Sequence, residues 1–272
     1  MFNMRQRVSN KGNKSFINSG RLKLYRVRKK IKESNVLLIS DSLGAIKAAI
    51  GSIVRNRNEL ENYIKINPSY QYALDPIGVD ETSPRIVKLA AKTAGMAGVG
   101  PMAVVSGALA DLALEAMLDH GAFVGVVENG GEIAANSILP LSVAIYAGNS
   151  PLSGKFGLQA SLEDFPIGIA TSSATVSHAI NFGEADAAIA IADTASLADA
   201  GAKRICNSVR GDIEGSIRSG LEAAKSLGFI RGAIVIRGGR IGIIGKLPKF
   251  ITIEGSIEDV FKSSFYEVFP EV

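Results

Sequence analysis

The sequence predicts an α+β fold built from layers. Strand-like and helix-like segments are interleaved without the strict strand–helix–strand alternation of a doubly wound protein. The 272 residues suit one large domain or two small ones, and no linker rich in Gly, Pro or Ser divides the chain. We therefore expect a flexible basic arm over residues 1–20 and a single domain over residues 21–272.

The first half of the chain predicts two strands followed by helices. Alternating apolar and basic residues, and then a β-branched run, are typical of strands. Apolar residues three and four apart predict a long helix that Asp41 would cap and Asn67-Pro68 would end. The expected segments are strands at 22–27 and 35–40, a loop at 68–82, and helices at 84–97 and 103–118.

The second half begins with short strands. Residues 194–227 predict two helices divided near Gly211-Asp212, and a hairpin turn is expected at Arg237-Gly238-Gly239-Arg240. The expected strands lie at 123–128, 132–135, 141–146, 156–160, 167–171, 185–192, 234–236 and 241–244.

The positive charge is concentrated at the N-terminus. Residues 1–32 hold 11 basic side chains and no acidic one, so the rest of the chain is net negative although the whole carries +4. Such an arm suits a solvated segment whose end becomes an edge strand, or an acidic partner. No aromatic or nucleic-acid motif accompanies it, so nucleic acid is not expected. The arm also lacks the apolar core of a signal peptide, so we expect a cytoplasmic protein without a membrane anchor.

Cysteine and histidine are scarce. One cysteine, Cys206, excludes a disulfide within the chain, and two histidines exclude a histidine-rich metal site. Lys203 and Arg204 would favour a Cys206 thiolate if that face were open, and a buried small apolar residue is the alternative. His120 is expected at a helix end, where the helix dipole accounts for it, which leaves His178 as the imidazole for acid–base chemistry.

Glycine-rich stretches are candidates for ligand binding. Gly98-Val99-Gly100 opens an expected helix, whose free N–H groups suit a phosphate. A helix precedes it, which is the wrong context for a dinucleotide fingerprint, and a close-packed interhelix turn is the alternative. Residues 128–132 predict a plain hairpin or a polar turn that exposes backbone and carboxylates to a flat ligand. Residues 146–155 predict a loop.

Hydroxyl groups gather after an expected strand. Thr171-Ser172-Ser173, with His178 nearby, suits an anion or cofactor held by hydroxyl and backbone donors. A serine hydrolase is a second possibility, but the sequence has no Gly-x-Ser-x-Gly. A structural Ser/Thr turn is the third.

Carboxylates stand in an apolar background further along the chain. Asp193 and Asp199 need partners or a metal ion in such surroundings, and carboxylates beside a phosphate suit Mg²⁺. Asp193 is also a candidate cap for the helix that follows it.

Taken in order, a series of stretches resembles the ApbE-type flavin transferase superfamily, and most closely its small uncharacterised cytosolic branch. The resemblance implies an ApbE-like layered antiparallel or mixed sheet with packed helices. It also implies FAD or FMN as ligand and, in the transferases, Mg²⁺ and transfer of FMN to a threonine of a target protein. The stretches are Ala97–Ala103, Ser106–Asp111, Val127–Ile133, Ile145–Gly154, Thr171–His178 and Ala192–Ala200, within residues 22–245.

The resemblance also implies site residues. The transferases' helix motif places its glycine at Gly107 and its aspartate at Asp111. Their metal-binding aspartate matches Asp199. The cofactor-binding residues expected here are Gly100, Gly107, Asp111, Asn129, Gly130, Gly131, Glu132, Asn149, Thr171, Ser172 and Ser173, and the expected metal ligands are Asp193 and Asp199.

The chain departs from the transferase pattern at three places. Ser106 replaces a lysine, and the Asp-Pro and Thr-Gly pairs of the transferases' histidine loop are missing after His178. Lys203 stands where the transferases have a threonine associated with the metal. An ammonium at that position would repel Mg²⁺, compete for Asp199 or contact a ligand phosphate itself. His178 and Lys203 are therefore the candidate catalytic residues, and the case for Mg²⁺ is weakened.

The predicted function is binding of a flavin-like or other phosphate-bearing small molecule in a central cleft. The branch's family context adds assistance to sulfur transfer and homocysteine formation in anaerobic metabolism. The alternatives are an Mg²⁺-dependent FAD:protein FMN transferase, and a non-catalytic assembly factor that depends on a protein partner. A homo-oligomer is compatible with the Ala- and Gly-rich composition. Whether the protein is an enzyme stays open at this point.

Overall fold

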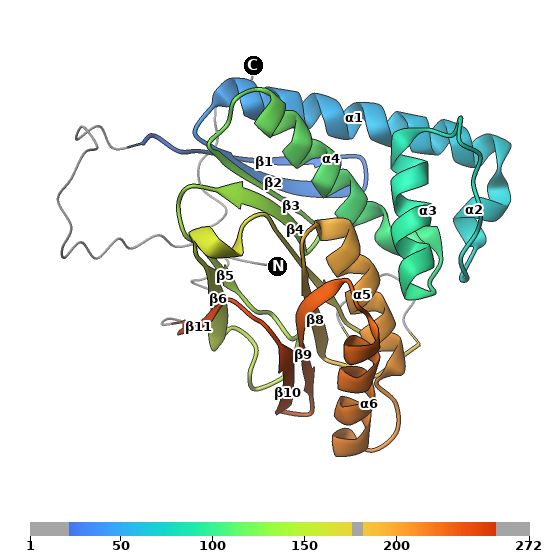
Figure 1. Ribbon diagram of the computed structural model, residues 1–272, viewed down its shortest axis with the longest axis vertical. Helices are drawn as coiled ribbons and strands as arrows, with labels where there is room; N and C mark the ends of the chain where they lie inside the picture. The colour runs from blue at the N-terminus through green and yellow to red at the C-terminus, as the bar shows by residue number, and fades with distance from the viewer. Residues whose placement is uncertain (1–21, 176–181, 254–272) are drawn as a thin grey trace.

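The computed structural model describes residues 22–175 and 182–253, which form two sheets with helices on one side (Figure 1). The larger sheet has eight strands in the order β1-β2-β3-β4-β7-β8-β9-β10, and the smaller has three in the order β11-β6-β5. Neighbouring strands pair antiparallel throughout both sheets. The predicted α+β class is confirmed.

The strands follow the sequence pattern closely. The basic segment after the arm forms β1, an edge strand, as expected. The short strand β11 was not predicted; it forms an edge of the small sheet and pairs with β6. The large sheet contains β1 Tyr25–Ile31, β2 Ser34–Ser40, β3 Val124–Asn129, β4 Glu132–Ser137, β7 Ile167–Ser172, β8 Ala187–Ala192, β9 Ile230–Arg237 and β10 Arg240–Gly245, and the small sheet contains β5 Leu141–Ala144, β6 Phe156–Ala160 and β11 Lys249–Thr252.

The helices lie on one face of the large sheet (Figure 1). Helices α1 and α4 cover the β2–β4 part of the sheet, and α5 and α6 cover the β7–β10 part. The helices are α1 Leu43–Ile66, α2 Pro68–Tyr72, α3 Arg85–Ala97, α4 Val105–Asp119, α5 Ala195–Ser208 and α6 Ile213–Ser226, with short 3₁₀ helices η1 Pro101–Val104 and η2 Leu162–Asp164.

Two local predictions in this region were wrong. Ser42, rather than Asp41, caps α1, since its hydroxyl accepts a hydrogen bond from the N–H of Ala45. The Asp41 carboxylate instead accepts from the N–H groups of Phe123 and Val124, and so ties the start of α1 to β3. The expected loop after α1 opens with α2, because Pro68 is compatible with the first position of a helix.

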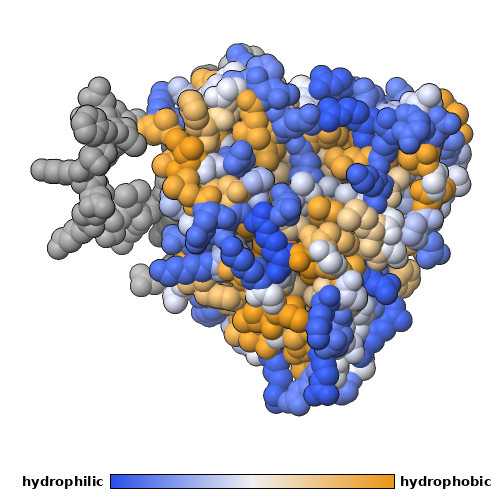
Figure 2. Space-filling view, in the orientation of Figure 1, coloured by the Kyte–Doolittle hydropathy of each residue, from blue (hydrophilic) through white to orange (hydrophobic). Residues whose placement is uncertain are grey.

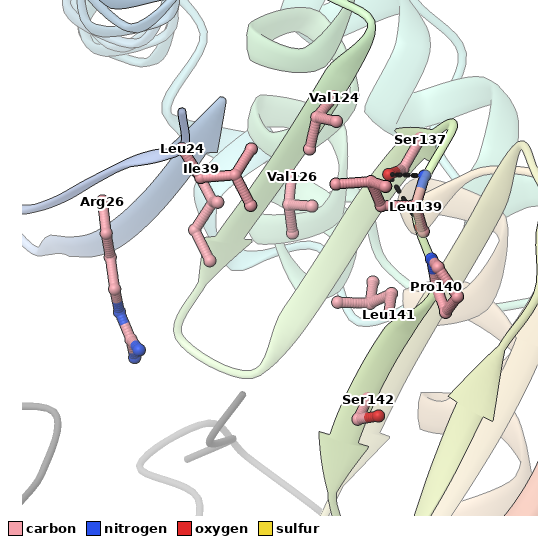
Figure 3. Close-up of a pocket in the computed structure, with 10 residues that line it drawn as sticks. All are labelled: Leu24, Arg26, Ile39, Val124, Val126, Ser137, Leu139, Pro140, Leu141 and Ser142. Atoms are coloured by element: carbon pink, nitrogen blue, oxygen red, sulfur yellow. Dashed lines mark hydrogen bonds between the residues drawn. The ribbon is translucent and has the colours of Figure 1, made fainter. Parts of the chain in front are cut away.

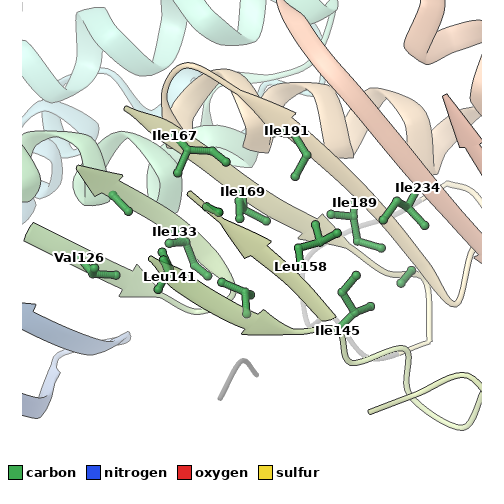
Figure 4. Close-up of a cluster of buried hydrophobic side chains, with 14 of the residues drawn as sticks. Val126, Ile133, Leu141, Ile145, Leu158, Ile167, Ile169, Ile189, Ile191 and Ile234 are labelled. Atoms are coloured by element: carbon green, nitrogen blue, oxygen red, sulfur yellow. The ribbon is translucent and has the colours of Figure 1, made fainter. Parts of the chain in front are cut away.

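Alternate residues of each central strand belong to different cores. Ile167, Ile169, Ile189 and Ile191 point to the small sheet, where the side chains of the two sheets interdigitate (Figure 4). The alanines between them, such as Ala170, pack under α5 and α6. Small residues on the helix face let α5 approach the sheet closely, which positions the side chains of α5 described below.

One stretch of the described residues is long and apolar enough to cross a membrane, Pro101–Asp119. Most of this stretch is buried inside the protein, where α4 packs between α1, α5 and the sheet. It is therefore accounted for as a core helix. In the view of Figure 2, apolar surface occurs in separate areas between hydrophilic side chains.

The core between the two sheets should be sensitive to lost volume. Ile189→Ala is expected to lower the free energy of unfolding by about 2–5 kcal/mol, because the fully buried side chain leaves a cavity. Urea unfolding measures this loss. Ile66→Ala is the matched control, since Ile66 is 81% exposed and its truncation should cost no more than about 0.5 kcal/mol. Equal losses in the two variants would contradict the assigned core.

Candidate functional site

Helices α4 and α5 meet at a glycine. A Cβ atom on Gly107 would lie 2.5 Å from the carbonyl oxygen of Ala195 and 2.9 Å from the Cβ of Asp199, so a larger residue would push the helices apart. The N–H of Gly107 lies in the first turn of α4, where no intrahelical partner exists. It donates to Oδ2 of Asp199 at 3.0 Å. A carboxylate from α5 therefore caps α4.

The capping is reciprocal. Asp111 on α4 accepts hydrogen bonds from the N–H groups of Ala195, at 2.7 Å, and Ser196, at 2.9 Å, in the first turn of α5. Burial raises the pKa of Asp111, and the hydrogen bonds from Ser196 and Ala195 oppose that rise. Thr194 is the N-cap residue of α5. The structure thus brings Asp111 and Asp199 to one helix junction, where each carboxylate holds the start of the other helix.

The β3–β4 turn lies against the same junction. Gly130 and Gly131 have φ values of +74° and +123°, which non-glycine residues rarely adopt. The side-chain amide of Asn129 donates to the carbonyl oxygen of Ser106 on α4, at 3.1 Å. Glu132, the first residue of β4, is buried. The predicted hairpin is confirmed, and the turn places Asn129 and Glu132 on the helix side of the sheet.

Glu132, Asp199 and Lys203 form a buried charged group, which we call the α5 ion cluster. Lys203 is one turn after Asp199 on α5 and is 6% exposed. Burial raises the pKa of Asp199 to about 7, opposed by the Gly107 N–H and the charge of Lys203. Burial and then the charge of Asp199 raise the pKa of Glu132 well above its ordinary value. Burial lowers the pKa of Lys203, and the charges of Asp199, Cys206 and Glu132 oppose that decrease.

A cavity of about 500 Å³ lies beside this cluster. Gly100 forms part of its wall and needs to be glycine, because a Cβ there would lie 1.9 Å from the carbonyl oxygen of Ala73. Its volume falls in the range of small-molecule sites. The lining combines apolar side chains with Lys203 and Asn207, and consists of Gln71, Ala73, Leu74, Val99, Gly100, Met102, Ala103, Phe182, Lys203 and Asn207.

The hydroxyl stretch is divided between the two faces of the sheet. Thr171 continues the side of β7 that faces the small sheet, and its buried Oγ1 has no hydrogen-bond partner among the described residues. Ser172 lies on the helix side, where it hydrogen-bonds Cys206. Ser173 accepts a hydrogen bond from the N–H of Thr175. Adjacent strand residues therefore reach different environments. His178 lies outside the described residues.

Asp193 and Asn149 lie apart from the α5 ion cluster. Asp193 is exposed and pairs with Arg231 at 2.6 Å, while the same guanidinium donates to the carbonyl oxygens of Asp164 and Pro166. The alternative role of Asp193 as a helix cap was wrong, since Thr194 takes it. Asn149 is exposed in the loop between β5 and β6 and does not line the cavity.

The described residues do not fit the Mg²⁺ implied by the resemblance. Mg²⁺ needs a nearly octahedral shell of oxygen ligands. No group of three or more His, Cys, Asp or Glu side chains with metal-site geometry occurs in residues 22–175 or 182–253. Asp193 is held by Arg231, one oxygen of Asp199 is used by Gly107, and Lys203 adds a positive charge next to Asp199.

Other depressions also contain polar side chains. A groove of about 440 Å³ between α1 and α4 is lined by several charged residues, Arg55, Glu59, Arg85, Glu115 and Asp119, none of which was expected at the site. An apolar groove of about 170 Å³ lies on the opposite face of the large sheet, where Leu24, Ile39 and Val126 surround it with Leu139 and Leu141 (Figure 3). No residue expected at the site from the sequence lines this groove. A further groove, between α3, α4 and the start of α5, is lined by one residue expected at the site, Asp111. We take the cavity beside Lys203 as the candidate site, because two expected residues, Gly100 and Lys203, line it.

Known proteins share the sequence family and the fold of this chain. The family model described as AbpE bacteria matches residues 15–238. This chain belongs to the AbpE bacteria family. Relatives include UPF0280 proteins from Methanocaldococcus jannaschii, 39% identical over 230 residues (84% of this chain, 93% of the relative), and Methanosarcina acetivorans, 37% identical over 233 residues (86% and 91%).

Solved structures show the fold of this AbpE bacteria family member in other proteins. The ApbE protein of Thermotoga maritima superposes with a TM-score of 0.59 and 14% identity, over 81% of this chain and 96% of that one. The apo flavinyl transferase ApbE of Pseudomonas stutzeri superposes with a TM-score of 0.53 and 12% identity, over 85% of this chain and 96% of that one. The predicted ApbE-like fold and the resemblance to a small branch are confirmed.

Several cavity residues were not predicted from the sequence. Leu74, Phe182 and Asn207 come from three segments outside the stretches that resemble the family, whereas Met102 lies in one of those stretches but was not assigned to the site. The spacing of Asp199 and Lys203, four apart on one helix face, was the available signal for the ion cluster. The reciprocal caps had no local signal, because their donors and acceptors are 84 to 92 residues apart.

The cap on α5 should contribute measurably to stability. Asp111→Ala is expected to lower the free energy of unfolding by about 1–2 kcal/mol, because two first-turn N–H groups lose a charged acceptor. Chemical unfolding measures the loss. Asp119→Ala, at the exposed C-terminal end of the same helix, is the control and should change stability by no more than about 0.5 kcal/mol. An Asp111→Ala protein with the same free energy of unfolding as the unaltered protein would refute the capping role.

The raised pKa of Asp199 predicts a pH dependence. Between about pH 4 and 7 the folded protein holds a proton on this carboxyl that the unfolded chain has released, so stability falls as pH rises through that window. Asp199→Asn should flatten this fall in urea unfolding midpoints measured across the range. Part of the pH dependence of stability should remain in Asp199→Asn, because the pKa of Glu132 is raised too.

Asp80→Asn is the control for this experiment. Hydrogen bonds from Thr82 lower the pKa of the Asp80 carboxyl, so its contribution changes below pH 4. The slope between pH 4 and 7 should therefore match that of the unaltered protein. The same slope in Asp199→Asn as in the unaltered protein would count against a proton on Asp199.

Proposed function

We propose that this protein binds a phosphate-bearing, flavin-like ligand in the cavity beside Lys203. The observation that carries the proposal is the position of a buried lysine in the wall of a cavity large enough for such a molecule. A buried ammonium has lost most of its hydration and gains from an anionic partner. A ligand phosphate would add acceptor oxygens to the contacts that Lys203 already makes within the protein.

The rest of the lining suits a flat ring. Leu74 and Phe182 are exposed apolar side chains at the cavity, and Met102 adds a polarisable thioether. Exposed apolar side chains beside a cavity are typical of sites that cover an aromatic ligand. The structural neighbours support the same ligand class, because the Pseudomonas stutzeri protein is described as a flavinyl transferase.

The two more specific functions have less support. Mg²⁺-dependent transfer of FMN to a protein needs a metal ion, and Lys203 places a positive charge beside Asp199, the carboxyl that the resemblance assigns to the metal. Assistance to sulfur transfer would need an accessible thiolate. Cys206 is fully buried and burial raises the pKa of its thiol, so this cysteine does not suit a persulfide carrier. Binding is therefore the function that the site supports best.

Titration of the purified protein with FMN and FAD tests the proposal. Saturable quenching of flavin fluorescence is expected, with a dissociation constant on the order of micromolar. Leu74→Asp should weaken binding about tenfold or more, because it places a negative charge where the apolar ring would lie. Leu74 is half exposed, so the fold should tolerate the change.

Ile66→Asp is the matched control, as Ile66 is exposed and does not line the cavity. Its affinity should equal that of the unaltered protein. No saturable binding of either flavin would overturn the proposal and favour the partner-dependent assembly factor. Equal losses of flavin affinity in Leu74→Asp and Ile66→Asp would mean that the ligand does not bind in this cavity.

A further inference from the structure

We propose that Lys203 is the fixed cation of this cavity, and that it holds the phosphate of an FMN-type ligand without a divalent metal ion. The inference rests on the proposed function and states how the anionic end of the ligand is recognised. It concerns the one member of the α5 ion cluster that also lines the cavity.

The members of the α5 ion cluster differ in their access to the cavity. Lys203 lines the cavity, whereas Asp199 and Glu132 do not. A ligand entering the cavity therefore contacts the lysine and neither acidic side chain. A divalent cation in the same place would meet the charge of Lys203 and find no carboxylate oxygen in the lining, which contains no Asp or Glu.

The carboxylate of Asp199 also has a structural role. Oδ2 of Asp199 accepts the first-turn N–H of Gly107, which keeps α4 and α5 in contact. Turning Oδ2 onto a metal ion would leave the buried N–H of Gly107 without its acceptor. The close approach at Gly107 also limits how far α5 can shift. Lys203 is thus presented to the cavity by a helix that has little freedom to rearrange.

A second polar side chain lies in the same wall. Asn207 is one turn after Lys203 on α5, and its Oδ1 accepts the N–H of Phe182 at 3.0 Å. With Oδ1 used as an acceptor, Nδ2 is the group of this amide that can donate to a ligand oxygen. An ammonium and an amide N–H, one helical turn apart, match the acceptor oxygens of a phosphate monoester.

The experiment compares ligands and metal conditions on the full chain. FMN and riboflavin, which lacks the phosphate, are titrated in EDTA and in excess Mg²⁺. FMN should bind about tenfold or more tightly than riboflavin in EDTA, as a charge-assisted hydrogen bond allows. Mg²⁺ should change the FMN dissociation constant by less than about twofold.

Variants then test the lysine itself. Lys203→Met keeps the length of the side chain without its charge, and should remove the preference for FMN over riboflavin. Lys203→Arg should retain most of that preference. Arg204→Met is the matched control, because Arg204 is an exposed cation on the same helix, and its FMN affinity should not change.

Each outcome decides a different point. FMN binding only in the presence of Mg²⁺ would overturn the fixed-cation inference and leave the proposed ligand class standing. Equal affinities for FMN and riboflavin in EDTA would also overturn it. No binding of either flavin would overturn the proposed function and the inference together. If Lys203→Met does not fold, the comparison of FMN with riboflavin on the unaltered protein gives the decision.

Discussion

Two carboxylates exchanged between α4 and α5 hold the candidate site together. Asp111 on α4 accepts the first-turn N–H groups of α5, and Asp199 on α5 accepts a first-turn N–H of α4. The free N–H groups of a helix start need acceptors when they are buried. Because each helix supplies the acceptor for the other, neither can rotate or slide without breaking a charged hydrogen bond. Gly107 permits the short distance between them.

This junction determines where Lys203 lies. Asp199 is fixed by the Gly107 N–H, so the residue one turn later on α5 has a fixed direction as well. Buried charges are costly unless they are paired, and here two carboxylates share one ammonium. Burial keeps the pKa values of Asp199 and Glu132 high, while that of Lys203 is lowered. The α5 ion cluster therefore lowers the stability of the fold. Ionisable groups with such shifted pKa values are typical of functional sites.

The fold could be predicted from local patterns, since the strands and helices each bury one regular face. The site could be predicted only in part. The resemblance to the transferases implied Gly107, Asp111 and the glycine turn at 130–131 as site residues, but not the exchange of caps between the two helices. Thr171 and Ser172 looked like one binding stretch, yet neighbouring strand residues point to opposite faces of a sheet. Asp193 was predicted to be a metal ligand, because no local sequence pattern indicates its partner Arg231, which is 38 residues away.

The most direct test of the central claim is a crystal structure of the FMN complex grown in the presence of Mg²⁺. The fixed-cation account predicts a phosphate oxygen within about 2.7–2.9 Å of Lys203 Nζ, with the Gly107–Asp199 hydrogen bond intact. It also predicts no divalent ion between the phosphate and Asp199. A metal ion bound by Asp199 with Lys203 displaced, or FMN bound in the apolar groove of Figure 3, would contradict it.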